Sequence, residues 1–391
     1  MTVPIQCSRD ETFVLNLGPQ HPATHGVLRV KLTMDGEYIV KAEPVLGYIH
    51  RMHEKMAESG TFAQFMPNTP RMDYLSALSY NQGYVMAVER AAGIEVPERA
   101  EYIRTITVEL NRISSHLLWF GAFVLDLGGF TPLLYAFDDR EKILDLLERI
   151  TGSRLTYCYY RFGGVYNDID DEFIAGTREF IKRLRSRLPS MYHDLVTGNI
   201  ILIKRLKDIG FVTQETCRKY GATGPVLRGS GVQYDVRKNE PYSVYPELDF
   251  DIPCYPEGDS MARYMVRMDE ITQSLRIIEQ ALDKLPEGPV NAKVPKVLKP
   301  EAGDCYCAVE AARGTFGCRL VCDGGKSPYR LKLRSPTFSN LSLFGEVAEG
   351  MILADALAFM GSLDLVIPCI CLLYTSPSPR DRTRSRMPSS A

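Results

Sequence analysis

A long block with helical periodicity, residues 48–206, limits most strongly the folds that this chain can adopt. Within the block, residues 102–127 and 140–160 carry apolar side chains at helical spacing, and glycine or proline separates such segments. Long amphipathic helices bury their apolar faces by packing against one another. The block therefore predicts a helical core.

Shorter stretches on both sides of this block alternate apolar and polar residues, which is typical of strands. Residues 12–45 predict a small antiparallel sheet in which residues 18–26 connect two strands. Residues 303–340 predict a second small sheet, followed by a last helix near residues 346–361. Residues 224–253 predict an irregular connection, and a helix capped by Asp259 or Ser260 follows it.

These patterns predict an α+β fold in which a central bundle of long helices is flanked by small β-rich units. The last residues, 371–391, are rich in Ser, Pro and Arg and predict a disordered tail. Codons for CLLYTS can spell a sequencing adaptor, so we expect this tail to be non-native. The expected units are 1–45 with the loop at 18–26, the helical core 46–223, the connection and long helix 224–302, the β-rich unit and terminal helix 303–370, and the tail 371–391.

Charge and hydropathy narrow the possible partners and the location. The net charge is -2, from 46 basic and 48 acidic residues, and gives no basic surface for nucleic acid. The N-terminus shows no secretory signal, so we expect the protein on the cytoplasmic side. The longest apolar stretch, residues 351–373, is interrupted by Asp355, Asp364 and Pro368, so any link to a membrane is expected through partner proteins.

The loop GPQHPATHG, residues 18–26, places His21 and His25 between prolines and glycines. Proline restricts the backbone and glycine permits tight turns, so the loop can hold an imidazole at a fixed angle toward a ligand. Histidine exchanges protons near neutral pH. From the residues alone, a purely structural loop is equally compatible.

The whole loop resembles that of the 49-kDa-type (D) subunit of respiratory complex I, the proton-pumping NADH:quinone oxidoreductase. Further strings resemble the same family in register, and the resemblance covers roughly residues 12–368. The strings are HRMHEK, PRMDYLS, DLGGFTP, LRGSGVQYDVRK and GSLDLVIP, together with Glu109, Arg112, Ile113, His116 and Leu117 and the pairs Arg313-Gly314 and Phe316-Gly317. The family is related to the large subunit of nickel–iron hydrogenases, which implies a hydrogenase-large-subunit-like fold.

The resemblance implies a site for quinone reduction. It places the quinone headgroup between Tyr74 and His25, with Asp126 behind the histidine as a buried carboxylate, and His21 as a weaker quinone contact that shapes the loop. A phenol and an imidazole are plausible donors of the two protons that quinone reduction consumes, and a carboxylate raises the proton affinity of a neighbouring histidine.

The resemblance also implies a nearby iron–sulfur cluster. Arg51, Arg154 and Arg161 are expected to lie beside it, although ion pairs within the subunit explain these arginines equally well. No cysteine set here matches a ferredoxin, and no glycine-rich fingerprint binds NAD or flavin, so this chain is expected to hold no cofactor alone.

The expected partners are the other subunits of complex I: a small subunit with the [4Fe-4S] cluster, a 30-kDa-type subunit and membrane subunits. The quinone is expected to be menaquinone or ubiquinone. The chain is then a peripheral subunit on the cytoplasmic face of the membrane, inactive alone and part of a translocase for electrons and protons. NADH, ferredoxin or a deazaflavin remain open as the upstream donor.

Three other interpretations compete with this one. A hydrogenase needs two C-x-x-C pairs, but the early position carries Asp73 and Ser76 instead of thiolates. Cys305, Cys307, Cys318 and Cys322 could bind zinc, but their spacing favours buried small apolar residues on two strands. A scaffold whose site has decayed is the non-enzymatic alternative, and the joint presence of Tyr74, His25 and Asp126 argues against it.

Overall fold

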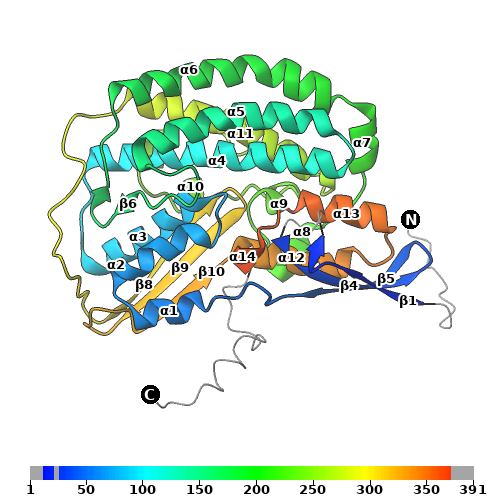
Figure 1. Ribbon diagram of the computed structural model, residues 1–391, viewed down its shortest axis with the longest axis horizontal. Helices are drawn as coiled ribbons and strands as arrows, with labels where there is room; N and C mark the ends of the chain where they lie inside the picture. The colour runs from blue at the N-terminus through cyan, green and yellow to red at the C-terminus, as the bar shows by residue number, and fades with distance from the viewer. Residues whose placement is uncertain (1–11, 22–25, 371–391) are drawn as a thin grey trace, which may run out of the picture.

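The structure, a computed structural model, describes residues 12–21 and 26–370. Its main body is a bundle of four long helices (Figure 1): α4 (Glu98–Asp126), α5 (Phe130–Thr151), α6 (Asp171–Arg187) and α11 (Ser260–Asp283). Helix α4 packs between its neighbours, and most of its side chains are buried. The long helices expected from the periodicity are present, and the bundle also includes α11, which lies beyond the expected core at 46–223. The tail at 371–391 and His25 lie outside the described residues.

The bounds of α5 differ from the expected helix at 140–160. The helix begins ten residues earlier and ends at Thr151, because Gly152 adopts a left-handed backbone with φ 72°. Pro132 lies in the first turn, where the missing N–H costs nothing. The helix was predicted to continue beyond Gly152 because the residues that follow are also apolar. Their tyrosines are instead buried in a loop that leads to the ribbon of β6 (Tyr160–Arg161) and β7 (Gly164–Val165).

The N-terminal sheet has the strand order β1-β4-β5, with β1 (Phe13–Leu17), β4 (Arg29–Asp35) and β5 (Tyr38–Val45) all antiparallel. Alternate residues of β4 point into the core, namely Val30, Leu32 and Met34. Between β1 and β4 the chain forms a ribbon of β2 (Gln20–His21) and β3 (Gly26–Val27). The predicted sheet is confirmed, and the loop at 18–26 lies between its first two paired strands.

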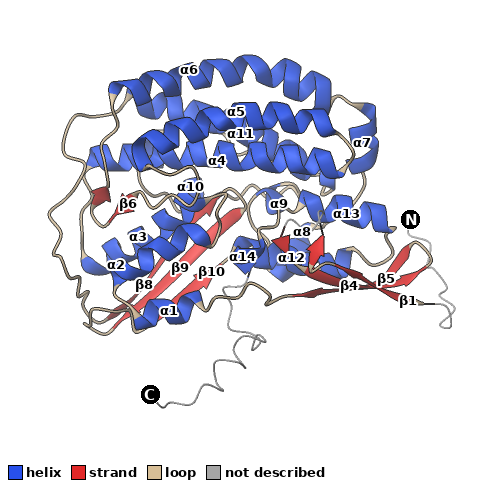
Figure 2. Cartoon of the chain, viewed as in Figure 1, coloured by secondary structure: helices blue, strands red, loops and turns tan. Residues whose placement is uncertain are grey.

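The second sheet has the order β10-β9-β8, with β8 (Gly303–Ala311), β9 (Gly314–Cys322) and β10 (Arg330–Arg334). Helix α3 (Ala77–Ala92) packs on it, and the three strands lie beneath α3 and the bundle (Figure 2). The contact is close, because a Cβ at Gly83 would lie 2.7 Å from the ring of Phe316. The turn between β8 and β9 lies beside the start of α3, because the Ala312 N–H donates to the Ser76 hydroxyl at 3.3 Å.

The C-terminal region contains two helices where one was expected at 346–361. Helix α12 (Pro336–Val347) ends before Gly350, whose φ is 81°, and α13 (Leu353–Ser362) begins after it; the short α14 (Ile367–Ile370) follows. Asp259 is the cap of α11, since its carboxylate accepts a hydrogen bond from the Ala262 N–H at 2.7 Å.

The remaining elements are short and connect these layers. They are α1 (His53–Ser59), α2 (Phe62–Phe65), η2 (Met66–Arg71), η3 (Leu188–Thr197), α7 (Ile200–Leu206), α8 (Gln214–Tyr220), α9 (Pro225–Arg228), α10 (Val236–Asn239) and η4 (Tyr245–Glu247). The last three make up the irregular connection expected after residue 224. Across the described ranges, no helix combines the length and apolar character that crossing a membrane requires.

Candidate functional site

Tyr74 lies in the turn between η2 and α3, and its ring is half-buried. The preceding residue, Asp73, is fully buried and fixes this turn, because its Oδ1 accepts hydrogen bonds from the N–H groups of Leu75 at 3.2 Å and Ser76 at 3.1 Å. The backbone that carries the phenol is therefore held from beneath by a carboxylate.

A buried arginine connects Asp73 to the C-terminal region. Arg313, in the turn between β8 and β9, donates from Nη1 to both oxygens of Asp73, at 3.1 and 3.0 Å, and from Nη2 to Oδ1 of Asp364 at 3.1 Å. Three segments that are far apart in sequence thus meet below Tyr74. The turn at Arg313 and the string GSLDLVIP around Asp364 both resemble the family, but only the fold brings them to Tyr74.

Electrostatics keep the phenol of Tyr74 protonated. Burial raises the pKa of Tyr74; Arg313 opposes that shift, while Asp73 and Asp364 raise the pKa further. Burial likewise raises the pKa of Asp73, against the attraction of Arg313. A phenol whose pKa lies above its ordinary value of about 10 holds its proton at neutral pH and can donate it to a bound oxygen.

The loop at 18–26 is anchored at both ends. Gly18 has φ 87°, and a Cβ there would lie 2.0 Å from the carbonyl oxygen of Leu28, so only glycine fits. At the other end, a Cβ on Gly26 would lie 3.0 Å from Ile367 of α14. Because Ile367 is three residues after Asp364, this end of the loop lies beside the segment that binds Arg313.

Of the two loop histidines, only His21 lies within the described residues. The backbone of His21 pairs with Gly26 in the ribbon of β2 and β3. Residues 22–25, including His25, lie outside the described residues, so the assignment of His25 to quinone stays a prediction.

Asp126 is the last residue of α4 and is exposed in this chain, whereas a buried carboxylate was expected. The physical reason is its position, since α4 ends beyond the part of the bundle that covers it. The turn after Asp126 borders a cavity of about 520 Å³ between the α4–α5 connection, η3 and α7. Its walls are mainly apolar and include Val124, Leu127, Phe130, Leu195 and Ile201.

The three arginines expected near a cluster fall into two groups. Arg154 pairs within the subunit with Asp145 at 2.9 Å, Glu148 at 2.7 Å and Glu141, which is the alternative interpretation for this residue. Arg161 instead donates to the carbonyl oxygens of Cys158 and Tyr160 and lies over the Tyr166 ring, 4.8 Å from its centroid. Arg51 is exposed just before α1.

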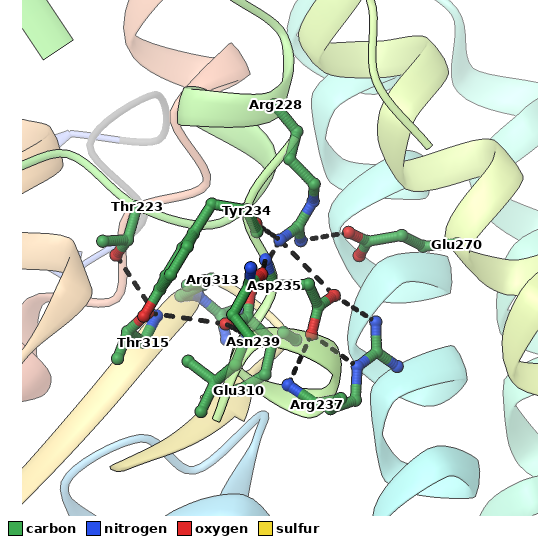
Figure 3. A network of polar contacts seen from close by, with 12 residues as sticks. Thr223, Arg228, Tyr234, Asp235, Arg237, Asn239, Glu270, Glu310, Arg313 and Thr315 are labelled. Atoms are coloured by element: carbon green, nitrogen blue, oxygen red, sulfur yellow. Dashed lines mark hydrogen bonds and ion pairs between the residues drawn. The ribbon is translucent and has the colours of Figure 1, made fainter. Parts of the chain in front are cut away.

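Sequence reasoning missed a buried ionic network behind this site (Figure 3). Arg228 is fully buried; it binds Glu310 at 2.8 Å, Glu270 on α11, and Asp235 at 3.5 Å. Arg237 joins from α10, with Nη2 at 2.7 Å from Asp235 Oδ2. The string LRGSGVQYDVRK marks three of these residues, but nothing in the sequence pairs them with Glu270 or Glu310.

Glu109 on α4 extends this network, because its Oε1 lies 3.1 Å from Arg237 Nη1, and it makes the fold sensitive to acid. Burial opposes the ionisation of Glu109. The positive charges of Arg112 and Arg237 and the hydroxyl groups of Ser274 and Tyr245 outweigh this effect and lower the pKa of Glu109 to about 2. A carboxylate whose pKa falls from 4.5 to about 2 on folding contributes about 3 kcal/mol near neutral pH, and this contribution is lost as the pH falls from 4.5 toward 2.

We therefore expect the thermal midpoint of this subunit in the assembled complex to fall across that pH window, and to fall less steeply in Glu109→Gln. Glu279→Gln, which removes only an exposed partner of Arg185, serves as the control and should keep the wild-type slope. Equal slopes in wild type and Glu109→Gln would show that Glu109 does not carry the acid sensitivity.

The cysteines form no recognisable metal centre in the described part of the chain. Cys307 faces Cys318 across the β8–β9 ladder, and both are buried in the core. Within residues 12–21 and 26–370, no three His, Cys, Asp or Glu side chains gather as a metal site requires.

At the position where a hydrogenase carries its early pair of cysteines, Asp73 binds Arg313, and the Ser76 hydroxyl accepts a hydrogen bond from the Ala312 N–H at 3.3 Å.

Comparison with known proteins gives one consistent result. The family model described as the 49-kDa subunit of the respiratory-chain NADH dehydrogenase matches residues 126–302 and 294–370. The D subunit of the NADH-quinone oxidoreductase of Desulfotalea psychrophila is 75% identical over 92% of this chain and 96% of the relative. Similar proteins are the D 2 subunit from Opitutus terrae, 68% identical over 92% of this chain and 90% of the relative, and the D subunit from Syntrophobacter fumaroxidans, 60% identical over 92% and 96%.

Proposed function

This chain belongs to the family of the 49-kDa subunit of the respiratory-chain NADH dehydrogenase, and we propose that it forms one wall of the quinone-reducing site of that complex. Its relatives are named as the D subunit of NADH-quinone oxidoreductase, so the chain acts as a subunit of this oxidoreductase. A likeness of its fold to nickel–iron hydrogenase large subunits is part of the proposal.

The observation that carries the proposal is the support beneath Tyr74. A half-buried phenol that keeps its proton is held by Asp73, Arg313 and Asp364, and the end of the histidine loop lies beside the same segment through Gly26 and Ile367. A merely structural tyrosine does not require three buried charged groups brought together from three distant segments.

The proposed chemistry assigns one proton donor to each quinone oxygen. As two electrons arrive, the Tyr74 hydroxyl gives its proton to one oxygen and His25 gives a proton to the other, so that a quinol forms. Asp126 orients His25 and stabilises its charged form, and His21 shapes the loop. Proton donation by a positioned side chain accelerates such steps by about 10²–10⁴-fold.

The electrons are proposed to come from a [4Fe-4S] cluster in a small neighbouring subunit. Arg51 and Arg161, which have no carboxylate partner among the described residues, are the better candidates to face that subunit, because Arg154 is already neutralised by three carboxylates. The chain would sit peripherally on the cytoplasmic face, against a 30-kDa-type subunit and membrane subunits, and accept menaquinone or ubiquinone.

The test of this proposal is His25→Ala in the assembled complex. We expect quinone reduction to fall at least about tenfold, because one of the two proton donors is lost, while electron transfer from NADH to an artificial acceptor upstream stays normal. His193→Ala on η3 removes an imidazole far from the loop in sequence and should leave both rates unchanged. Full quinone reductase activity in His25→Ala would instead support a scaffold subunit whose site has decayed.

A further inference from the structure

Several buried charged groups around Arg313 and α11 have polar atoms that no protein group satisfies. Arg267 on α11 is fully buried; its Nη1 donates to the Arg263 carbonyl oxygen at 2.9 Å, but Nε and Nη2 have no partner. Asp364 is 6% exposed, and its Oδ1 binds Arg313 while Oδ2 has no partner. The Nδ1 atom of the buried His116 and the Nε atom of Arg313 complete the set.

Arg267 and Asp364 are close neighbours in the interior. Asp364 is the charge that acts most strongly on Arg267, yet the two form no ion pair within 4 Å. The ring of Trp119 covers the guanidinium of Arg267 at 4.4 Å, and the indole N–H donates to the Gly361 carbonyl oxygen just before Asp364. His116 lies on the same helix as Trp119, and its Nε2 is 2.8 Å from Glu270 Oε2.

An unsatisfied buried polar atom costs about 1–3 kcal/mol, and more when it is charged. Natural proteins meet such atoms with buried water, which needs two to four polar partners and room for one molecule. Arg267 Nη2, Asp364 Oδ2 and His116 Nδ1 supply donors and acceptors of the right kinds.

We propose that Arg267 and Asp364 enclose a buried water site that returns protons to Tyr74 after each quinone reduction. The inference rests on the proposed function, in which Tyr74 loses its hydroxyl proton to the quinone. The O–H bond of a water held by Asp364 then breaks and the phenolate oxygen takes that proton. The hydroxide that remains takes a proton from bulk water, so that one proton from solvent is consumed for each Tyr74 phenol restored. Asp364 is a relay residue here and does not touch the quinone.

The surroundings of Asp364 suit this role. The charged and titratable groups that face it are Arg313 from the β8–β9 turn, Arg267 from α11, Asp73 before α3, and Tyr74. Two cations close to two carboxylates leave the cluster nearly neutral, so the loss or gain of a proton at Tyr74 does not have to overcome a large excess charge of one sign.

The experiment compares Asp364→Asn with wild type in the assembled complex, in water and in deuterium oxide. We expect kcat for quinone reduction to fall about tenfold, KM to stay within about twofold, and the solvent isotope effect on kcat to increase because proton return limits turnover. Asp364→Glu should restore most of the rate. Arg267→Met, which removes the other wall of the site, should give the same kinetic signature.

A matched control separates this effect from loss of any buried carboxylate. Asp139 on α5 is also fully buried and ion-paired, with Arg183 at 3.0 Å, and Asp139→Asn should leave the isotope effect unchanged. If Asp364→Asn and Arg267→Met assemble and keep the wild-type kcat and isotope effect, the water site is wrong while the proposed function stands. If Asp364→Asn fails to assemble, the kcat and the solvent isotope effect of Arg267→Met decide whether the water site exists. The proposed function is tested separately by His25→Ala and Tyr74→Phe, and it fails if these variants retain full activity.

Discussion

Replacing Tyr74 by phenylalanine in the assembled complex is expected to lower the rate of quinone reduction by about 100-fold or more. The substitution keeps the ring and its packing and removes only the hydroxyl proton. Because burial raises the pKa of Tyr74, the wild-type phenol is protonated throughout the physiological range, and the loss should be equally large from pH 6 to pH 9. The measurement is the NADH:quinone reductase rate across that range.

A second tyrosine provides the control. Tyr255 is also half-buried, and its hydroxyl donates to Asp269 at 2.6 Å, but it lies in the connection before α11 and contacts none of the groups below Tyr74. Tyr255→Phe should retain the wild-type rate. Comparable rates in wild type and Tyr74→Phe would remove Tyr74 from the proton-donating role, whatever else binds the quinone.

The largest effect on stability is expected from Arg228→Met. Arg228 neutralises Glu270, Glu310 and Asp235 in the interior, and its loss leaves these three buried carboxylates to share the more distant charges of Arg237, Arg112 and Arg267. Breaking one buried ion pair costs about 3–5 kcal/mol, which is comparable to the stability of a whole domain. We therefore expect less than about a tenth of the wild-type amount of assembled complex, measured by the content of this subunit in purified membranes.

Arg276 is the matched surface arginine. It pairs with Asp249 and Asp251 at exposed positions, so Arg276→Met should change the amount of complex little, because exposed ion pairs contribute about 0–1 kcal/mol. A normal yield of Arg228→Met would contradict the view that this network stabilises the fold.

Much of the fold could be predicted because it depends on local patterns. Helix α4, the cap at Asp259 and the alternation of β4 follow from periodicity and hydrogen-bonding preferences of nearby residues. The errors also have local causes. The predicted bounds of α5 were shifted toward the C-terminus because buried tyrosines after Gly152 continue the apolar pattern although the helix has ended. The single helix predicted near the C-terminus is two helices because Gly350 interrupts it.

The site was harder to predict from the residues themselves. Tyr74, His25 and Asp126 came from a family resemblance, because no spacing rule joins residues so far apart in sequence. The support of Tyr74 by Arg313 and Asp364 depends on the β8–β9 turn and the segment after α13 meeting beneath α3. The packing of the whole chain brings these segments together. The sequence therefore shows which residues are charged but not which of them pair with one another.

The most direct measurement is labelling of the assembled complex with a quinone analogue that carries a photoreactive group on its headgroup ring. If the chain forms the site as proposed, the label attaches to residues 71–76 and to the loop at 18–26, and excess quinone prevents the attachment. Labelling confined to the apolar cavity beside Phe130 and Ile201, or attachment only to other subunits while the analogue still inhibits, would contradict the assignment of Tyr74 and the histidine loop to the quinone headgroup.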